Sequence, residues 1–180
     1  MKRFPYIFLA LLVAFSIACK LLTPATSTPQ AVHSTQPALD SSSSETSALV
    51  NIYDPARNPA DDLQQAIVLA QKENKHIMLE LGGNWCIWCK YMDEFYANHP
   101  DILKLRAENY VLVKVNYSEE NTNDGFLSQF PSAPGYPHIY ILDSDGTLLH
   151  SQDTAELEDG KSSYVPEVFI AFLEKWAPNK

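Results

Sequence analysis

The sequence predicts an α/β domain in which a central mixed β-sheet is flanked by helices on both faces. Segments with helical periodicity alternate with short apolar segments that are typical of buried strands. Two of these strands are separated by a helical segment, and another two only by the turn residues 143–146. Strands joined through a helix pair in parallel, and strands joined by a tight turn pair antiparallel, so the sheet is expected to be mixed.

The composition fits one folded domain with an acidic surface. The chain has 180 residues, 46% of them hydrophobic, and a formal net charge of −9. This length allows one sizeable core but not two full-sized domains. The Lys and Arg residues form no cluster suited to a phosphate backbone, so no nucleic-acid partner is expected. Three cysteines are too few to staple a fold, and no cofactor is indicated.

Residues 1–18 are expected to be an export signal. Lys2 and Arg3 precede an almost unbroken apolar run over residues 6–17, which is shorter than the roughly 20 residues that span a membrane. The segment that ends at Cys19 resembles a bacterial lipoprotein processing site. This resemblance implies a lipid on Cys19, membrane anchoring through it, and a periplasmic or cell-envelope location. The alternative is an ordinary signal peptide cut nearby.

Residues 19–48 are expected to be a disordered tether. Among the 25 residues from Thr23 to Ser47 there are 12 Ser or Thr and 3 Pro, with few large apolar side chains. Such a segment cannot bury enough apolar surface to become ordered. A flexible tether would let the domain that follows it search the volume near a membrane.

The folded domain is assigned to residues 49–180. Its first helix is expected over residues 58–74, because the Asn58 side chain can cap a helix and Pro59 suits the first helical position. Residues 76–81 are rich in Ile, Met and Leu and end at two glycines, which predicts a buried strand.

The remaining elements follow from the same signals. A second helix is expected over residues 86–98 and is ended by Pro100. A second strand is expected over residues 110–117, and a helical turn over residues 126–130. Two hairpin strands and a terminal helix complete the domain, at residues 138–142, 147–150 and 165–176.

Cys86 and Cys89 stand at the start of the second predicted helix, separated by two residues. Two thiols at this spacing can close a small disulfide ring, and the helix N-terminus stabilises the first sulfur as a thiolate. Cys86 is therefore the expected nucleophile. Cys89, one helical turn further in, is the expected resolving thiol and the more buried of the two.

A single C-x-x-C pair also forms half of many zinc sites. This chain has no second cysteine pair, and its five histidines show no paired ligand spacing, so no metal is expected. A purely structural disulfide is the other alternative.

The segment from Trp85 to Lys90, WCIWCK, resembles the active-site segment of thioredoxin-like proteins, especially the exported WCxWCK branch. The resemblance covers residues 49–176. It implies the thioredoxin fold and thiol–disulfide oxidoreductase activity on protein or peptide thiols and disulfides. It also implies a membrane-embedded electron donor as a partner. Ile87 and Trp88 replace the Gly-Pro of thioredoxins proper, so the redox potential does not carry over.

Further residues match the family in register. Glu80 corresponds to the buried acid that moves the proton of the resolving cysteine, and Lys114 to the strand lysine that faces this acid. The two residues could instead form only a structural ion pair. Tyr136 and Pro137 match the family's cis-proline loop, in which the residue before proline offers main-chain hydrogen bonds to an extended substrate; an ordinary trans proline is the alternative.

Trp85 and Trp88 could form a hydrophobic rim for the substrate or cover the core. His138 is expected to be a strand residue with a satisfied side chain. Two functions therefore stay open. The first is an exported thiol–disulfide oxidoreductase, with the reductase or isomerase direction favoured. The second is a non-enzymatic, tethered adaptor or chaperone whose cysteine pair stays locked as a disulfide.

Overall fold

The structure is a computed structural model that describes residues 52–179. The predicted export signal, the tether and Cys19 lie outside the described residues. The helices and strands, in chain order, are α1 (Pro59–Glu73), β1 (His76–Gly82), α2 (Ile87–Asn98), α3 (Pro100–Asn109), β2 (Tyr110–Asn116), α4 (Asp124–Leu127), β3 (His138–Leu142), β4 (Leu148–Asp153), the 3₁₀ helix η1 (Thr154–Leu157) and α5 (Pro166–Lys175). No helix within this part of the chain has the length and apolar content needed to cross a membrane.

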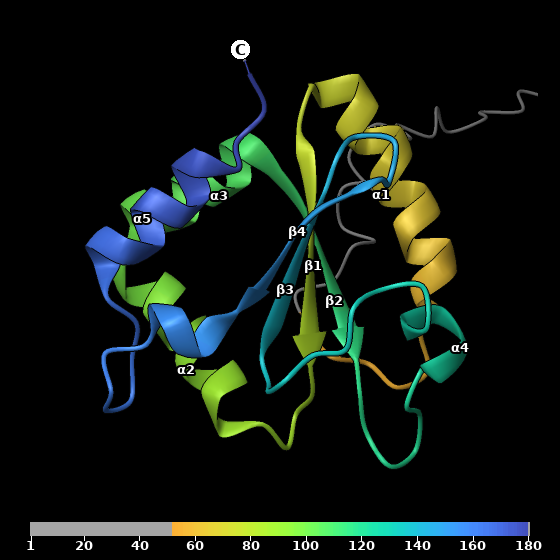
Figure 1. The fold of residues 1–180 in the computed structure, drawn as a ribbon, viewed down its shortest axis with the longest axis horizontal. Helices are drawn as coiled ribbons and strands as arrows, with labels where there is room; N and C mark the ends of the chain where they lie inside the picture. The colour runs from red at the N-terminus through yellow and green to blue at the C-terminus, as the bar shows by residue number, and fades with distance from the viewer. Residues whose placement is uncertain (1–51, 180) are drawn as a thin grey trace, which may run out of the picture. The chain divides into compact units, whose positions relative to one another are not determined.

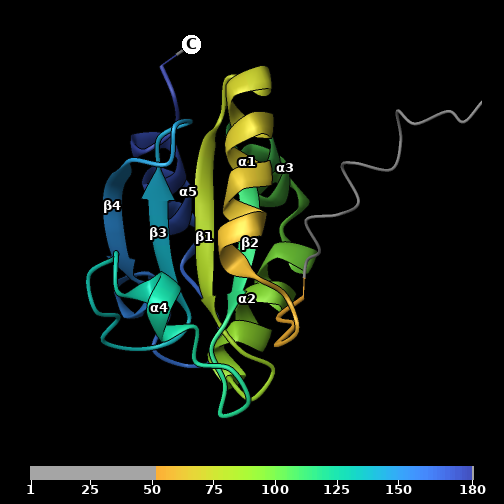
Figure 2. The same ribbon diagram turned by 90° about the vertical axis from the view of Figure 1, so that its right-hand side faces the viewer.

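The four strands form one mixed sheet in the order β2-β1-β3-β4. Strand β1 pairs in parallel with β2 and antiparallel with β3, and β3 pairs antiparallel with β4. Helices α1 and α4 cover one face of the sheet, and α2, α3 and α5 cover the other (Figure 1). The turned view in Figure 2 shows α1 running along the face of β1 and β2. The predicted α/β architecture is confirmed.

Strand β1 lies in the middle of the sheet and contributes to both halves of the core. Its alternate side chains point to opposite faces. Met78 packs in the core under α2, α3 and α5, whereas Ile77 and Leu79 pack in the core under α1. Glu80 has the same parity as Met78, so the strand delivers one carboxyl group to the face that α2 covers.

The ends of α1 agree with the sequence signals. The Asn58 side chain accepts a hydrogen bond from the Ala60 backbone N–H at 3.0 Å, and Pro59 occupies the first helical position. Asn74 adopts a left-handed conformation with φ of 54° and ends the helix. The helix therefore places its buried face, with Leu63 and Ala66, against the sheet.

Some elements differ from the prediction. Pro100 was expected only to end a helix, but it also begins α3, because proline suits the first helical position as well as stopping the preceding helix. Helix α4 lies slightly before the predicted residues 126–130. Strand β4 extends past His150 to Asp153 because it is an edge strand, whose polar side chains give no apolar alternation.

Candidate active site

Cys86 and Cys89 form a disulfide at the start of α2, with their Cα atoms 5.2 Å apart. Cys86 is the N-cap residue of α2, and its sulfur accepts a hydrogen bond from the Cys89 backbone N–H at 3.1 Å. The free N–H groups of a helix N-terminus favour negative charge, and in the reduced protein they would favour the Cys86 thiolate. The helix start therefore gives Cys86 the environment of a nucleophile.

The two cysteines are largely covered. Cys86 is 4% exposed and Cys89 is 1% exposed, so Cys89 is the more buried, as predicted. Tyr53 is buried in the same cluster, and Trp88 and Tyr136 pack against it. Aromatic side chains therefore border the Cys86 sulfur, and an incoming sulfur would approach it beside them.

The loop before β3 lies beside the cysteines. The Tyr136–Pro137 peptide bond is cis, as the family resemblance implied. The Tyr136 ring stacks on Tyr117 with centroids 5.0 Å apart, and it meets the Trp85 ring edge-on at 5.5 Å. Burial and the neighbouring Tyr117 raise the pKa of Tyr136 to about 12, so the phenol stays neutral at physiological pH. These rings form an aromatic wall next to the disulfide.

A buried ion pair lies on the same sheet face as α2. Glu80 and Lys114 face each other in the β1–β2 register, and both side chains are fully buried. The Lys114 ammonium is 3.4 Å from Glu80 Oε1 and also donates a hydrogen bond to Asp93 of α2. The Tyr53 hydroxyl donates a hydrogen bond to Glu80 Oε1 at 2.6 Å. Glu80 and Lys114, which the sequence predicted, are thus brought together. Tyr53 and Asp93 bond to them as well.

The comparisons with known proteins agree with this geometry. A family model described as thioredoxin-like matches residues 58–144. The chain belongs to the thioredoxin-like family. The solved structure of a disulphide isomerase from Xylella fastidiosa Temecula1 superposes with a TM-score of 0.59 at 21% identity, covering 70% of this chain and 97% of that chain. This likeness confirms the predicted thioredoxin fold.

The thioredoxin-like domain also has relatives among characterised sequences. The thiol:disulfide interchange protein DsbD of Vibrio vulnificus is 29% identical over 117 residues, which is 63% of this chain and 19% of that protein. Spermatogenesis-associated protein 20 of Homo sapiens is 36% identical over 133 residues, which is 69% of this chain and 17% of that protein. The chain therefore spans less than a fifth of the length of these relatives, and each likeness concerns only part of a longer protein.

The two tryptophans of the thioredoxin-like motif lie in different environments. Trp85 is 56% exposed, and its indole N–H donates a hydrogen bond to the Tyr117 carbonyl oxygen at 2.7 Å. Trp88 is half-buried and meets the rings of Tyr91 and Tyr164 edge-on. Trp85 therefore stands at the rim of the site, whereas Trp88 covers the core.

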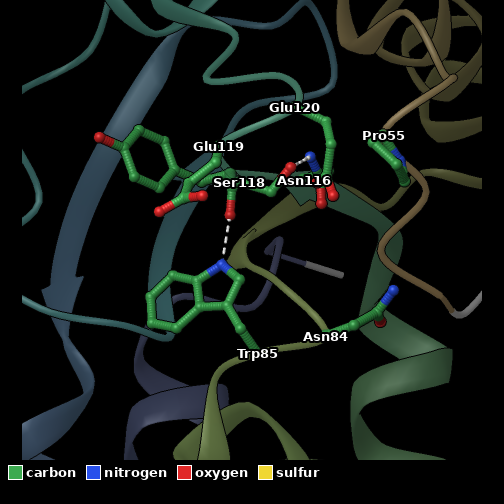
Figure 3. A pocket seen from close by; sticks show the side chains of 8 residues that line it. Pro55, Asn84, Trp85, Asn116, Ser118, Glu119 and Glu120 are labelled. Atoms are coloured by element: carbon green, nitrogen blue, oxygen red, sulfur yellow. Dashed lines mark hydrogen bonds between the residues drawn. The ribbon is translucent and has the colours of Figure 1, made fainter.

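A pocket of about 620 Å³ opens beside Trp85 in the thioredoxin-like domain (Figure 3). Figure 3 shows Trp85 on one side of it and the chain that leaves β2 on the other. The residues that line the pocket are Pro55, Asn84, Trp85, Asn116, Tyr117, Ser118, Glu119 and Glu120. The sequence alone did not predict this pocket, since a pocket between separate loops leaves no local pattern.

Sequence reasoning missed Tyr53 and Asp93 as members of the site. Asp93 lies seven residues after Cys86, two helical turns along the same side of α2, and this spacing could have revealed it. Burial raises the pKa of Asp93, and the Lys114 ammonium opposes that rise. Tyr53 comes from the segment before α1, which has no periodicity that would point to the cysteines.

The described part of the chain, residues 52–179, contains no group of three or more His, Cys, Asp or Glu side chains placed to hold a metal ion. The chemistry that the site can perform with its own groups is sulfur exchange. A disulfide at a helix N-terminus, next to a buried carboxyl group, can open to two thiols and close again.

His138 follows Pro137 and is buried in β3, with Nε2 2.8 Å from Ser151 Oγ. Within residues 52–179 its Nδ1 atom has no hydrogen-bond partner. Burial lowers the pKa of His138. The unfolded chain, with an ordinary histidine pKa of about 6.5, therefore binds this proton more strongly than the folded chain does.

The contribution of His138 to the stability of the domain is therefore fully present at a pH above the pKa that this histidine has in the unfolded chain. It is lost as the pH falls from that pKa towards the lower pKa of the folded chain. We expect a His138→Gln variant to lose less unfolding free energy than the wild type between about pH 7 and pH 5. Urea unfolding at a series of pH values measures this difference. Equal losses in the two proteins would contradict the prediction.

Proposed function

We propose that this chain is an exported thiol–disulfide oxidoreductase of the WCxWCK branch that acts on protein or peptide thiols and disulfides. The observation that carries the proposal is the Cys86–Cys89 disulfide, which sits at the N-terminus of α2 beside the cis-proline loop. The name of its Vibrio relative, a thiol:disulfide interchange protein, supports the same chemistry.

In the reducing direction, the Cys86 thiolate attacks one sulfur of a substrate disulfide, and the other substrate sulfur leaves as a thiolate. Cys89 then loses its proton and attacks the Cys86 sulfur of the mixed disulfide. The Cys86–Cys89 bond forms, the bond to the substrate breaks, and the second substrate thiolate leaves. The substrate has gained two electrons, and a membrane-embedded donor would return the protein to the dithiol form.

Glu80 is proposed as the base that accepts the Cys89 proton, with Lys114 holding the carboxyl group in place. Both residues lie on the sheet face that α2 covers, which is the face that carries the cysteines. A base buried in a site closed to water can take the proton only from a neighbouring group, which confines proton transfer to the cysteine.

Trp85, Tyr136 and Pro137 are proposed to bind the substrate, with Trp88 supporting them from the core side. An extended client segment would pair with the main chain of Tyr136, as peptides pair with exposed strand edges. Its neighbouring side chains would enter the pocket beside Trp85. The exposed indole ring gives this pocket apolar contact area.

The proposed location is the periplasm or cell envelope. Residues 1–18 would direct export, Cys19 would carry the lipid, and residues 19–48 would tether the domain. Mass spectrometry of the protein isolated from membranes tests this location, since lipidation adds an acyl mass to an N-terminal Cys19. An unmodified N-terminus elsewhere in the leader would contradict it.

Turnover of insulin disulfides with dithiothreitol as reductant tests the activity. The full chain is expected to bring insulin precipitation forward relative to dithiothreitol alone, and an unchanged onset would contradict the proposal. The reductase or isomerase direction is tested by the equilibrium potential of the cysteine pair. A value near about −270 mV fits a reductase, whereas one near about −120 mV would identify an oxidase.

The low exposure of Cys86 and Cys89 favours one second candidate. A tethered adaptor or chaperone with a permanently closed disulfide would also keep both cysteines covered. The two functions differ in whether activity depends on Cys86.

A further inference from the structure

The position of Tyr53 is not explained by packing alone. Its side chain is 3% exposed, although it comes from the chain before α1. It is buried in one cluster with Cys86 and Cys89. Its backbone carbonyl accepts a hydrogen bond from the Asn84 side chain at 2.9 Å, which ties it to the loop that leads into the cysteines.

The Tyr53 hydroxyl contacts the buried carboxyl group and lies near the resolving cysteine. It donates a hydrogen bond to Glu80 Oε1 at 2.6 Å. A Cβ atom on Gly82 would lie 2.9 Å from this hydroxyl oxygen and 2.5 Å from the Cys89 sulfur. The hydroxyl and the sulfur therefore border the same small volume, which stays open because residue 82 has no side chain.

We infer that the Tyr53 hydroxyl relays the proton of Cys89 to Glu80 when the mixed disulfide is resolved. The S–H bond of Cys89 breaks and its proton binds Tyr53 Oη, while the original Tyr53 proton passes along the existing hydrogen bond to Glu80 Oε1. The Cys89 thiolate is then free to attack. The relay rests on the proposed thiol–disulfide exchange and adds to it the route of the proton.

The surroundings of Tyr53 suit a relay that stays neutral. Burial, followed by the nearby Glu80 carboxylate, raises the pKa of Tyr53 well above its ordinary value. A phenol that keeps its proton can donate to Glu80 and accept from a thiol at the same time. The Lys114 ammonium lies 4.6 Å from the Tyr53 ring centroid, and this cation–π contact fixes the ring below the ion pair.

The test separates the two sulfur steps. One equivalent of Ellman's reagent is mixed with the reduced protein, and its coloured thiolate is followed by stopped flow. The first release reports attack by Cys86 and the second reports resolution by Cys89. At about pH 7, Tyr53→Phe should slow the second release about tenfold or more and leave the first unchanged.

The pH dependence distinguishes a relay from packing. Rising hydroxide concentration offers the Cys89 proton a second acceptor, so the ratio of the wild-type rate to the variant rate should fall between about pH 7 and about pH 9.5. Tyr110→Phe is the matched control, because it removes another buried hydroxyl, one that bonds the Leu173 carbonyl oxygen at 2.7 Å. It should leave both releases unchanged.

A second variant keeps the relay testable if Tyr53→Phe alters the packing. Since Tyr53 and Glu80 would act in one step, the double variant Tyr53→Phe, Glu80→Gln should be no slower in the second release than the slower single variant. Additive slowing, slowing of both releases alike, or the same degree of slowing at about pH 7 and at about pH 9.5 would overturn the relay. Absence of any release from the wild type would overturn the proposed function and the relay with it.

Discussion

Replacing Cys86 by serine is expected to reduce insulin turnover to the background rate of dithiothreitol alone. A serine hydroxyl is far too weakly acidic to attack a disulfide as its anion, whereas a thiol at a helix N-terminus ionises readily. Cys89 is 1% exposed and cannot take over the attack on a large substrate. The insulin assay, run with equal amounts of wild type and variant, measures the effect.

Cys89→Ser is the matched control, because it removes the other sulfur of the same disulfide. This variant can still attack through Cys86 but cannot release what it captures, so mixed disulfides with client proteins should accumulate as reductant-sensitive bands. Equal insulin turnover in the wild type and Cys86→Ser would instead favour the adaptor. An absence of adducts with Cys89→Ser would argue against protein clients.

The parts of the fold that the sequence predicts well are those with strong local signals. Asn58 and Pro59 mark the start of α1. The Asn58 side chain caps the helix, and the ring of Pro59 already holds its φ angle near the helical value. Strand β1 is predictable because a strand buried on both faces is nearly continuously apolar, and Glu80 is the one polar residue between Ile77 and Leu81. The cysteine spacing likewise depends only on neighbouring residues, so the start of α2 followed directly.

The parts that escaped prediction depend on contacts between distant segments. Helix α3 has few apolar residues in a regular pattern, and Pro100 could be taken for a stop as readily as for a start. Tyr53 reaches the cysteines only because the chain before α1 folds over them. The pocket beside Trp85 needs three separate segments to meet. None of these arrangements leaves a periodic signal.

The roles proposed for the two cysteines rest on different kinds of electrostatic environment. The Cys89 backbone N–H at the start of α2 donates to the Cys86 sulfur, and the helix N-terminus favours the charged form of that sulfur without any titratable partner. Cys89 lies deeper, in one buried cluster with Tyr53, whose hydroxyl bonds Glu80 of the buried Glu80–Lys114 pair. Its ionisation therefore depends on a proton acceptor inside the protein. We therefore expect the Glu80–Lys114 ion pair to affect both the stability of the domain and its thiol–disulfide exchange.

Replacing Lys114 by methionine is expected to lower the free energy of unfolding by about 3–5 kcal/mol, the usual cost of breaking a buried ion pair. Methionine fills a similar volume, so the loss comes from leaving the fully buried Glu80 carboxylate without its cation. Urea unfolding followed by tryptophan fluorescence measures it. Lys104→Met removes the exposed lysine that pairs with Glu108 at 3.7 Å and should change the stability by less than about 1 kcal/mol.

A double-mutant cycle identifies why Lys114→Met lowers the free energy of unfolding. If Lys114→Met destabilises the domain through the uncompensated carboxylate, then adding Glu80→Gln should restore part of the lost free energy, because a neutral amide costs less to bury than an unpaired charge. If the second substitution instead adds a further loss, the damage lies in packing around residue 114. A loss below about 1 kcal/mol for Lys114→Met alone would mean that Glu80 carries no uncompensated charge in the variant, either because it binds a proton or because water reaches it.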